Sequence, residues 1–222
     1  MLDVLQLRHF EAIPQVDPGK IGRVIGMGAQ SMVWSYGAPH EDKPQVIKAP
    51  LWQVRNGLYS MTIGRMIGQT ADTARRELDL CDEYFSKHMV PTEVHRGADG
   101  KFCIVQDMVP MTEVTLQVFR DVSSVRDQLS EIIEGNHKMI AEQRKWLDAM
   151  GFNATKLLAF ALRGEPYLDN VARDTQSGNL KLFDYGLFPM PDQAFFRSYY
   201  RVILAIQQAN MAKFGLDFGG KA

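Results

Sequence analysis

The clearest pattern of apolar and polar positions in the chain is a short hairpin near residue 175. Residues 180–182 alternate between apolar and polar side chains, as a half-buried strand does. Residues 175–178 supply the polar side chains and the glycine that favour a tight turn. Asn170 precedes this hairpin and Asp184 follows it. The pattern therefore predicts two short strands with an amide at one end and a carboxylate at the other, a pair that could share a metal ion.

The first half of the chain has the alternation and turn residues of an antiparallel sheet. We predict strands over 21–25, 32–36 and 44–48, joined by a glycine-rich turn and then a polar loop. Further extended segments are expected at 90–95 and 102–106. Residues 49–70 show no sustained period, and we interpret them as an insertion.

A helix is predicted over residues 71–87, because apolar side chains recur there at spacings of three and four. Thr70 or Asp72 can cap its N-terminus. We expect Asp79 to lie on the polar face. Glu77 is the acid that borders the apolar stripe, and a carboxylate that faces inward needs a partner because burying a lone charge is costly.

The second half is dominated by helical periodicity. We predict a long helix capped by Ser123 or Ser124, continuing to about Met150 and closed by Gly151. Further helices are expected at about 154–162 and 192–214. The fold class is therefore expected to be α+β, with strands concentrated before about residue 106.

Composition narrows the function classes without choosing one. The net charge is −1, so no basic field favours nucleic acid as a partner. Cys81 and Cys103 fit neither a metal spacing nor a disulfide framework. We expect no membrane span, because no apolar run is long enough. The first residues lack the features of a secretory signal, so a cytoplasmic location is the default expectation. Delivery by a specialised secretion system would leave no mark that can be read.

Two features of the first half could bind phosphate. One is a glycine-rich turn that can offer backbone N–H groups, with the residues Gly26, Gly28, Ser31 and Val33. An ordinary hairpin turn is the alternative. The other is Lys48, which ends an apolar strand and could be positioned by Glu77. A lysine at such a place can also be a surface residue whose stem covers apolar neighbours.

The order of features along residues 21–186 resembles that of the protein kinase-like superfamily. The features are a glycine-rich loop, a strand lysine, a helix glutamate, a linker strand, a long helix, an asparagine-containing loop, a hairpin and the motif Asp184-Tyr185-Gly186. The resemblance implies a bilobal fold with a β-rich N-lobe over 1–110, containing the insertion, and a truncated, mainly helical C-lobe over 111–222. It also implies ATP and Mg²⁺ as cofactors.

Roles for individual residues follow from the resemblance. Lys48 would hold the α- and β-phosphates and be oriented by Glu77. Asp184 and Asn170 would hold magnesium. The backbone near Asp107 and Val109 would meet the adenine, so these two residues complete the expected nucleotide-binding set.

The sequence departs from the family pattern at the catalytic loop. The His-Arg-Asp motif is absent, and Glu165 stands five residues before Asn170, where the catalytic aspartate is expected. Asp169 is the alternative base. Only a short segment follows Gly186, which implies a minimal kinase similar to some bacterial effector kinases.

We therefore expect a minimal, atypical Ser/Thr kinase that transfers the γ-phosphate of ATP to a protein hydroxyl. The identity of the protein substrate and the oligomeric state are not predicted. The alternatives are a pseudokinase, a binding module without phosphoryl transfer, a small-molecule kinase and a nucleotidyl transferase.

Overall fold

The protein folds into two compact units. One comprises Met1–Leu80 and Val90–Val109, and the other comprises Cys81–Met89 and Pro110–Ala222. The structure is a computed structural model, and the residues that it describes are 13–27, 31–37, 44–50, 70–97, 101–151, 153–194 and 197–219. Most of the expected insertion, residues 51–69, lies outside the described residues. None of the described helices is long and apolar enough to cross a bilayer.

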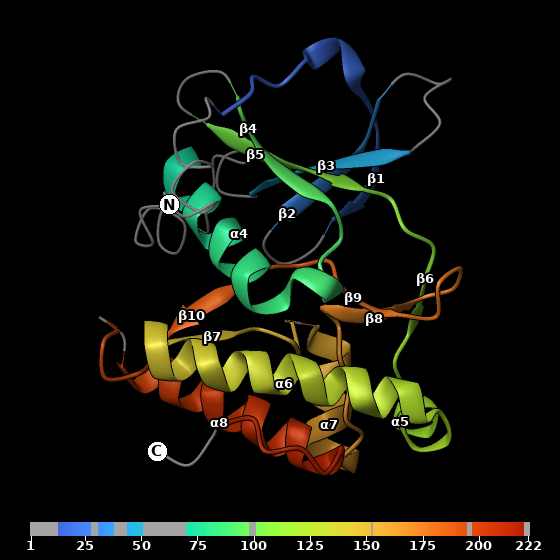
Figure 1. Cartoon of the computed structure of the whole chain (residues 1–222), viewed down its shortest axis with the longest axis vertical. Helices are drawn as coiled ribbons and strands as arrows, with labels where there is room; N and C mark the ends of the chain where they lie inside the picture. Colours follow the sequence, from blue (N-terminus) through green and yellow to red (C-terminus); the bar gives the residue numbers. More distant parts are fainter. Residues whose placement is uncertain are drawn as a thin grey trace, which may run out of the picture. The chain divides into compact units, whose positions relative to one another are not determined.

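The first unit is built on a five-stranded sheet in which every neighbouring pair of strands is antiparallel (Figure 1). The strands, in chain order, are β1 (Ile21–Met27), β2 (Ser31–Tyr36), β3 (Gln45–Pro50), β4 (Thr92–Arg96) and β5 (Phe102–Asp107). Their order across the sheet is β1-β2-β3-β5-β4. A short 3₁₀ turn, Pro18–Lys20, precedes β1. The predicted strands and the α+β class are confirmed.

Helix α4 (Ala71–Phe85) packs its apolar stripe on strands of this sheet. Ala74 belongs to one buried cluster with Val94 of β4 and Phe102 of β5. The hydroxyl oxygen of Thr70 accepts a hydrogen bond from Thr73 N at 3.2 Å, which confirms Thr70 as a cap. The expectation that Asp79 lies on the polar face is wrong. Its side chain is buried, and its carboxylate pairs with Arg75 at 3.1 Å.

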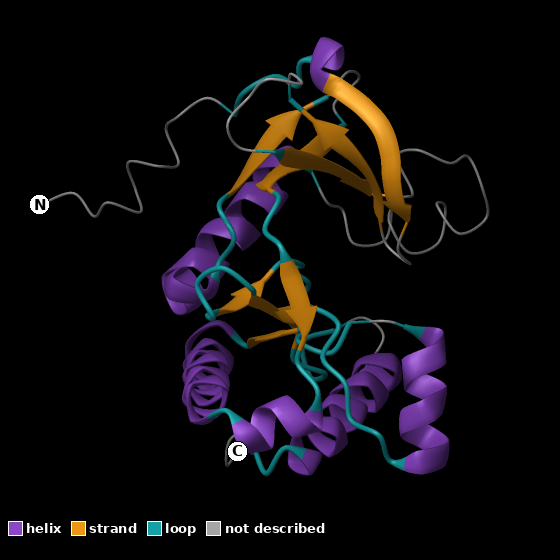
Figure 2. Ribbon diagram, turned by 90° about the vertical axis from the view of Figure 1, so that its right-hand side faces the viewer, coloured by secondary structure: helices purple, strands orange, loops and turns teal. Residues whose placement is uncertain are grey.

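The second unit combines helices with two small antiparallel sheets (Figure 2). Its helices are α5 (Leu116–Asp121), α6 (Ser123–Gln143), α7 (Ala154–Arg163) and α8 (Arg197–Lys213), with a short 3₁₀ segment, η3 (Ser86–His88), after α4. Its strands are β6 (Met111–Glu113), β7 (Lys145–Leu147), β8 (Val171–Asp174), β9 (Leu180–Leu182) and β10 (Leu187–Pro189). One sheet has the order β6-β8-β9, and the other pairs β7 with β10.

The prediction of one helix from Ser123 to Met150 is wrong in its last turns. Helix α6 ends at Gln143, because Arg144 adopts a left-handed conformation with φ 54°. The chain then becomes extended as β7 and pairs with β10. The N-terminal cap position is Val122, which makes no side-chain capping bond, so the serine cap is also wrong.

A buried amide and a buried indole join α6 to the strands of the second unit. Asn136 of α6 is fully buried, accepts a hydrogen bond from Leu147 N at 2.9 Å and donates one to Phe218 O at 3.2 Å. The Trp146 ring packs against Phe188 and Phe218, with centroid distances of 4.9 and 6.1 Å. These contacts hold β7 in place, and β7 leads directly into the candidate site.

Candidate functional site

The register of the first sheet places three candidate residues side by side. Gly26 of β1 lies opposite Val33 of β2, and Val33 lies opposite Lys48 of β3. Ser31 begins β2 and pairs with Pro50. Among the described residues, the neighbour that a Cβ atom on Gly26 would meet is Val33, at 4.0 Å, which is an ordinary contact distance.

The other nucleotide-binding candidates of the first unit are spread over three elements. Glu77 is half-buried on α4, in the same unit as Lys48. Asp107 ends β5, and its carboxylate accepts a hydrogen bond from Gln45 Nε2 at 3.0 Å. Val109 is partly exposed two residues later. Gly28 lies outside the described residues.

The structure brings the two metal-ligand candidates of the second unit to adjoining ends of one hairpin. Asn170 directly precedes β8, and Asp184 lies just after β9. The hairpin is antiparallel, with Ala172 opposite Lys181. Phe183 N donates to Asn170 O at 3.3 Å, which ties the start of the hairpin to its end. The predicted hairpin is confirmed.

A third acid, Asp148, lies beside this pair, and the sequence pattern did not identify it. Its backbone carbonyl accepts from Asn170 Nδ2 at 2.6 Å, and its N–H donates to Gly186 O at 2.8 Å. Asp148 follows β7, which pairs with β10 just beyond Gly186, so the two strands bring it there. The sequence pattern places this position in the long helix, where an acid carries no signal of burial.

The Asp148 carboxyl group is buried, and its ionisation is shifted. Burial, with a smaller contribution from the negative charge of Asp184, raises the pKa of Asp148 to about 6. Hydrogen bonds from Gly151 N, at 2.8 Å, and from Gln207 Nε2 oppose this shift. Carboxyl groups with such a pKa occur often at functional sites, which marks Asp148 as part of the candidate site.

The chain leaves this site through α7 and then returns to it. Asp169 N donates to Met150 O at 3.0 Å, and Asn170 N donates to Ala149 O at 3.3 Å. Gly151 makes the exit turn, with φ 68°. A Cβ atom there would lie 2.7 Å from Asn170 Oδ1, so glycine is required both by conformation and by space.

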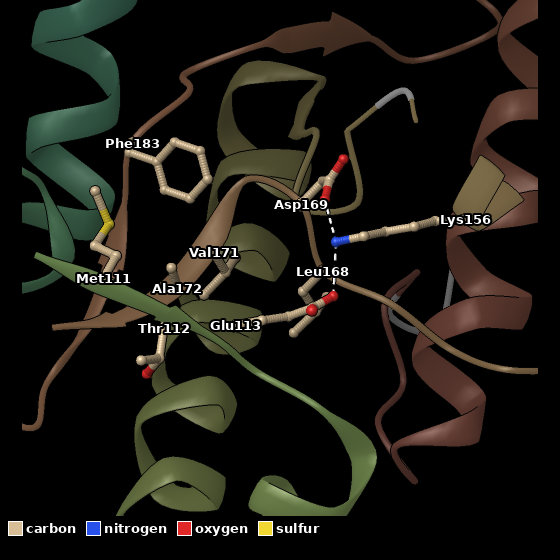
Figure 3. Close-up of a pocket in the computed structure, with 9 residues that line it drawn as sticks. All are labelled: Met111, Thr112, Glu113, Lys156, Leu168, Asp169, Val171, Ala172 and Phe183. Carbon is tan, nitrogen blue, oxygen red and sulfur yellow. Dashed lines mark hydrogen bonds and ion pairs between the residues drawn. The ribbon is translucent and has the colours of Figure 1, made fainter. Parts of the chain in front are cut away.

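A pocket of about 320 Å³ adjoins Asn170 within the second unit (Figure 3). The hairpin residues Val171 and Ala172 form part of its wall, and Phe183, the residue before Asp184, forms another part. The remaining lining residues are Met111, Thr112, Glu113, Lys156, Leu168 and Asp169. The wall is apolar with charged groups along one side, as expected for a site that binds an organic ligand.

Those charged groups form a triad around the Lys156 ammonium group. Figure 3 shows Lys156 reaching from α7 toward two carboxylates. Its Nζ atom lies 2.6 Å from Asp169 Oδ1 and 2.6 Å from Glu113 Oε1. Burial alone would lower the pKa of Lys156, but the two carboxylates outweigh it and raise that pKa above its ordinary value. Lys156 is therefore charged at neutral pH and fixes the orientation of Asp169.

The structure separates the two candidate bases. Asp169 lines the pocket, and a quarter of its side chain is exposed. Glu165 follows the C-terminal end of α7, more than half of its side chain is exposed, and it pairs with Arg163 at 3.1 Å. Glu165 is not among the residues that line the pocket. The geometry thus favours Asp169 over Glu165 as the acid that a bound ligand would meet.

The donor chemistry of the hairpin ends fits a magnesium ion. Asn170 and Asp184 offer an amide oxygen and a carboxylate, both of them hard ligands. Mg²⁺ is commonly held by one or two carboxylates together with phosphate and water oxygens. Among the described residues, no group of three or more His, Cys, Asp or Glu side chains could hold a metal ion.

A scan against protein-family models and a search of curated protein sequences return no match for this chain.

Proposed function

We propose that this protein is an ATP- and Mg²⁺-dependent phosphotransferase, a minimal kinase that transfers the γ-phosphoryl group to a hydroxyl of a protein substrate. The observation that carries the proposal is that Asn170 and Asp184, two magnesium-type donors, lie at adjoining ends of one hairpin. A pocket adjoins that hairpin. The ordered set of sequence motifs supports the same function.

In the proposed reaction, each residue has a task that its chemistry suits. Asn170 and Asp184 would hold Mg²⁺, which supplies charge neutralisation at the phosphates when it is bound. Lys48 binds phosphate oxygens with its ammonium group, and Glu77 orients that lysine. Asp169 accepts the proton of the acceptor hydroxyl, and its carboxylate is held for this by Lys156.

Nucleotide binding is the first test, by thermal shift with Mg-ATP. The wild-type protein should be stabilised, because a ligand that binds only the folded state raises the unfolding free energy. Lys48→Ala and Asp184→Asn should lose most of the shift. The matched controls are Lys87→Ala and Asp127→Asn, which remove exposed charges and should keep it. No shift for the wild type, or equal shifts in all variants, would refute the proposal.

Phosphoryl transfer is the second test, with γ-labelled ATP and a generic acceptor such as dephosphorylated casein. Asp169→Asn should lower the transfer rate by roughly 10²- to 10⁴-fold, the range typical of a lost general base. Glu165→Gln should stay close to wild type, because Glu165 lies outside the pocket lining. The opposite ranking of the two variants would exclude Asp169 as the base.

One observation favours a second candidate function, nucleotide binding without transfer. The Oδ1 atom of Asp169 is already paired with Lys156, and an ion pair of this kind also occurs in proteins that bind a nucleotide and transfer no phosphate. A pseudokinase of this kind would pass the thermal-shift test and transfer no label to the acceptor.

A further inference from the structure

Helix α8 presents two buried amide side chains on one face. Gln207 and Asn210 are three residues apart, a spacing that brings side chains together on a helix. Gln207 is 2% exposed and Asn210 is fully buried. Buried amides are costly unless they are hydrogen-bonded, so their partners indicate what they hold.

Gln207 reaches the metal-ligand side of the site through Asp148. Its Nε2 atom donates to Asp148 Oδ1. The backbone of Asp148 in turn forms two hydrogen bonds. Its carbonyl accepts one from Asn170 Nδ2 at 2.6 Å, and its N–H donates one to Gly186 O at 2.8 Å. Gly186 is two residues beyond Asp184, so Gln207 supports the segments that carry both magnesium-type donors.

Asn210 reaches the other side of the site through the backbone of Tyr167. Its Oδ1 atom accepts from Tyr167 N at 3.0 Å, and its Nδ2 atom donates to Tyr167 O at 2.8 Å. Both backbone groups of Tyr167 are thereby fixed two residues before Asp169. Burial first, and then the negative charges of Asp169 and Asp148, raise the pKa of the Tyr167 hydroxyl.

We infer that Gln207 and Asn210 are positioning residues with separate tasks. Gln207 sets the geometry of the metal ligands, and Asn210 sets the place of Asp169. This inference rests on the proposed phosphotransferase function. It deepens that function by giving the terminal helix a role in the reaction without contact with the substrate. Groups that orient metal ligands or a base commonly affect metal affinity or activity by 10- to 100-fold.

Two substitutions in the full chain separate the tasks. Gln207→Met keeps the length of the side chain and removes its donor, and Asn210→Ser removes both bonds to Tyr167. Mg²⁺ affinity is measured by calorimetry with a non-hydrolysable ATP analogue, and kcat is measured by label transfer from ATP to casein. Gln207→Met should weaken Mg²⁺ binding by about tenfold or more. Asn210→Ser should lower kcat by about tenfold or more while Mg²⁺ affinity stays within about twofold.

A readout that needs no catalysis accompanies these assays. Amide hydrogen exchange of the ligand-free protein should rise over 149–151 in Gln207→Met and over 167–170 in Asn210→Ser. Ile132→Val is the matched control, because it shortens a buried side chain of α6 that cannot form a hydrogen bond to either segment. It should change neither Mg²⁺ affinity nor kcat. If Asn210→Ser fails to fold, Asn210→Asp replaces it, since the aspartate still accepts from Tyr167 N.

The possible failures are distinguishable. If both variants lower Mg²⁺ affinity and kcat in parallel, or if neither differs from Ile132→Val, the inference is overturned while the proposed function stands. If the wild-type protein binds no Mg-ATP at all, the proposed function and the inference fall together. A loss of Mg²⁺ affinity alone in Gln207→Met, together with a loss of kcat alone in Asn210→Ser, supports the separate tasks.

Discussion

Replacing Asp148 with asparagine should stabilise the ligand-free protein at neutral pH. Asp148 is 5% exposed, and its Oδ1 atom accepts hydrogen bonds from Gly151 N and Gln207 Nε2. An asparagine keeps an oxygen for these donors and carries no charge. It therefore resembles the protonated aspartic acid, the form that burial favours.

The size of the effect follows from the shift in pKa. An unperturbed aspartate has a pKa of 3.8, and burial raises the pKa of Asp148 to about 6. This difference corresponds to roughly 3 kcal/mol, because one pKa unit is worth about 1.4 kcal/mol. A raised pKa in the folded state gives stability that is complete below pH 3.8 and is lost as pH rises through about 6. The ionised carboxylate is therefore a cost to the wild-type protein at pH 7 to 8.

The assay is urea unfolding of wild-type and Asp148→Asn protein at several pH values between 4 and 8, with a chelator present. The variant should be more stable at pH 8, by at most about 3 kcal/mol. The difference in unfolding free energy between the two proteins should narrow as the pH falls through 6 and should vanish near pH 4. Asp192→Asn is the control, because hydrogen bonding to Arg144 lowers the pKa of the exposed Asp192 and its loss should bring no gain. A difference that is equal at pH 4.5 and pH 8, or a less stable variant at pH 8, would show that burial of charge does not govern Asp148.

Further outcomes follow from the same contacts. Gly151→Ala should lower the free energy of unfolding by more than about 1 kcal/mol, because alanine is strained at φ 68° and its Cβ would approach Asn170 Oδ1. Gly215→Ala is the matched comparison in urea unfolding: φ is 74° there, but no atom of the described residues lies within 4 Å of a Cβ, so an equal loss would refute the packing argument. Lys156→Met should lower stability by about 1 kcal/mol, the upper end of the range for exposed ion pairs, because this pair is partly exposed. Because the pKa of Lys156 is raised, this wild-type advantage should be complete at neutral pH and decline only above pH 10.5, and an advantage that vanishes by pH 8 would contradict the triad.

The hairpin and the first sheet were predictable because local rules and tertiary structure agree there. The alternation over 180–182 and the turn over 175–178 specify β8 and β9, with Asn170 and Asp184 at the ends. The strands β1 and β2, on either side of the predicted glycine-rich turn, follow the same rules. These segments contain the candidate site residues that the sequence pattern identifies.

The rest of the candidate site depends on interactions between distant parts of the chain. The helical spacing of apolar residues continues past Gln143, but Arg144 adopts a left-handed conformation that its residue type does not indicate. This break creates β7 and places Asp148 in the core, where burial makes it a functional candidate. Lys156 is a cation on a largely apolar helix, and only the folded chain brings it to Asp169.

The closed excursion through α7 means that this helix can change while the backbone of the hairpin stays in place. The segments on either side of the excursion are joined by backbone hydrogen bonds, from Asp169 N to Met150 O and from Asn170 N to Ala149 O. A shorter or longer connection between them would leave those bonds in register, and lengthening a loop costs little conformational entropy. Residues 153–166 are thus a place where evolution or an engineer could graft a different segment. Since α7 also supplies Lys156, such a graft would exchange one wall of the pocket while keeping the hairpin and its two donors.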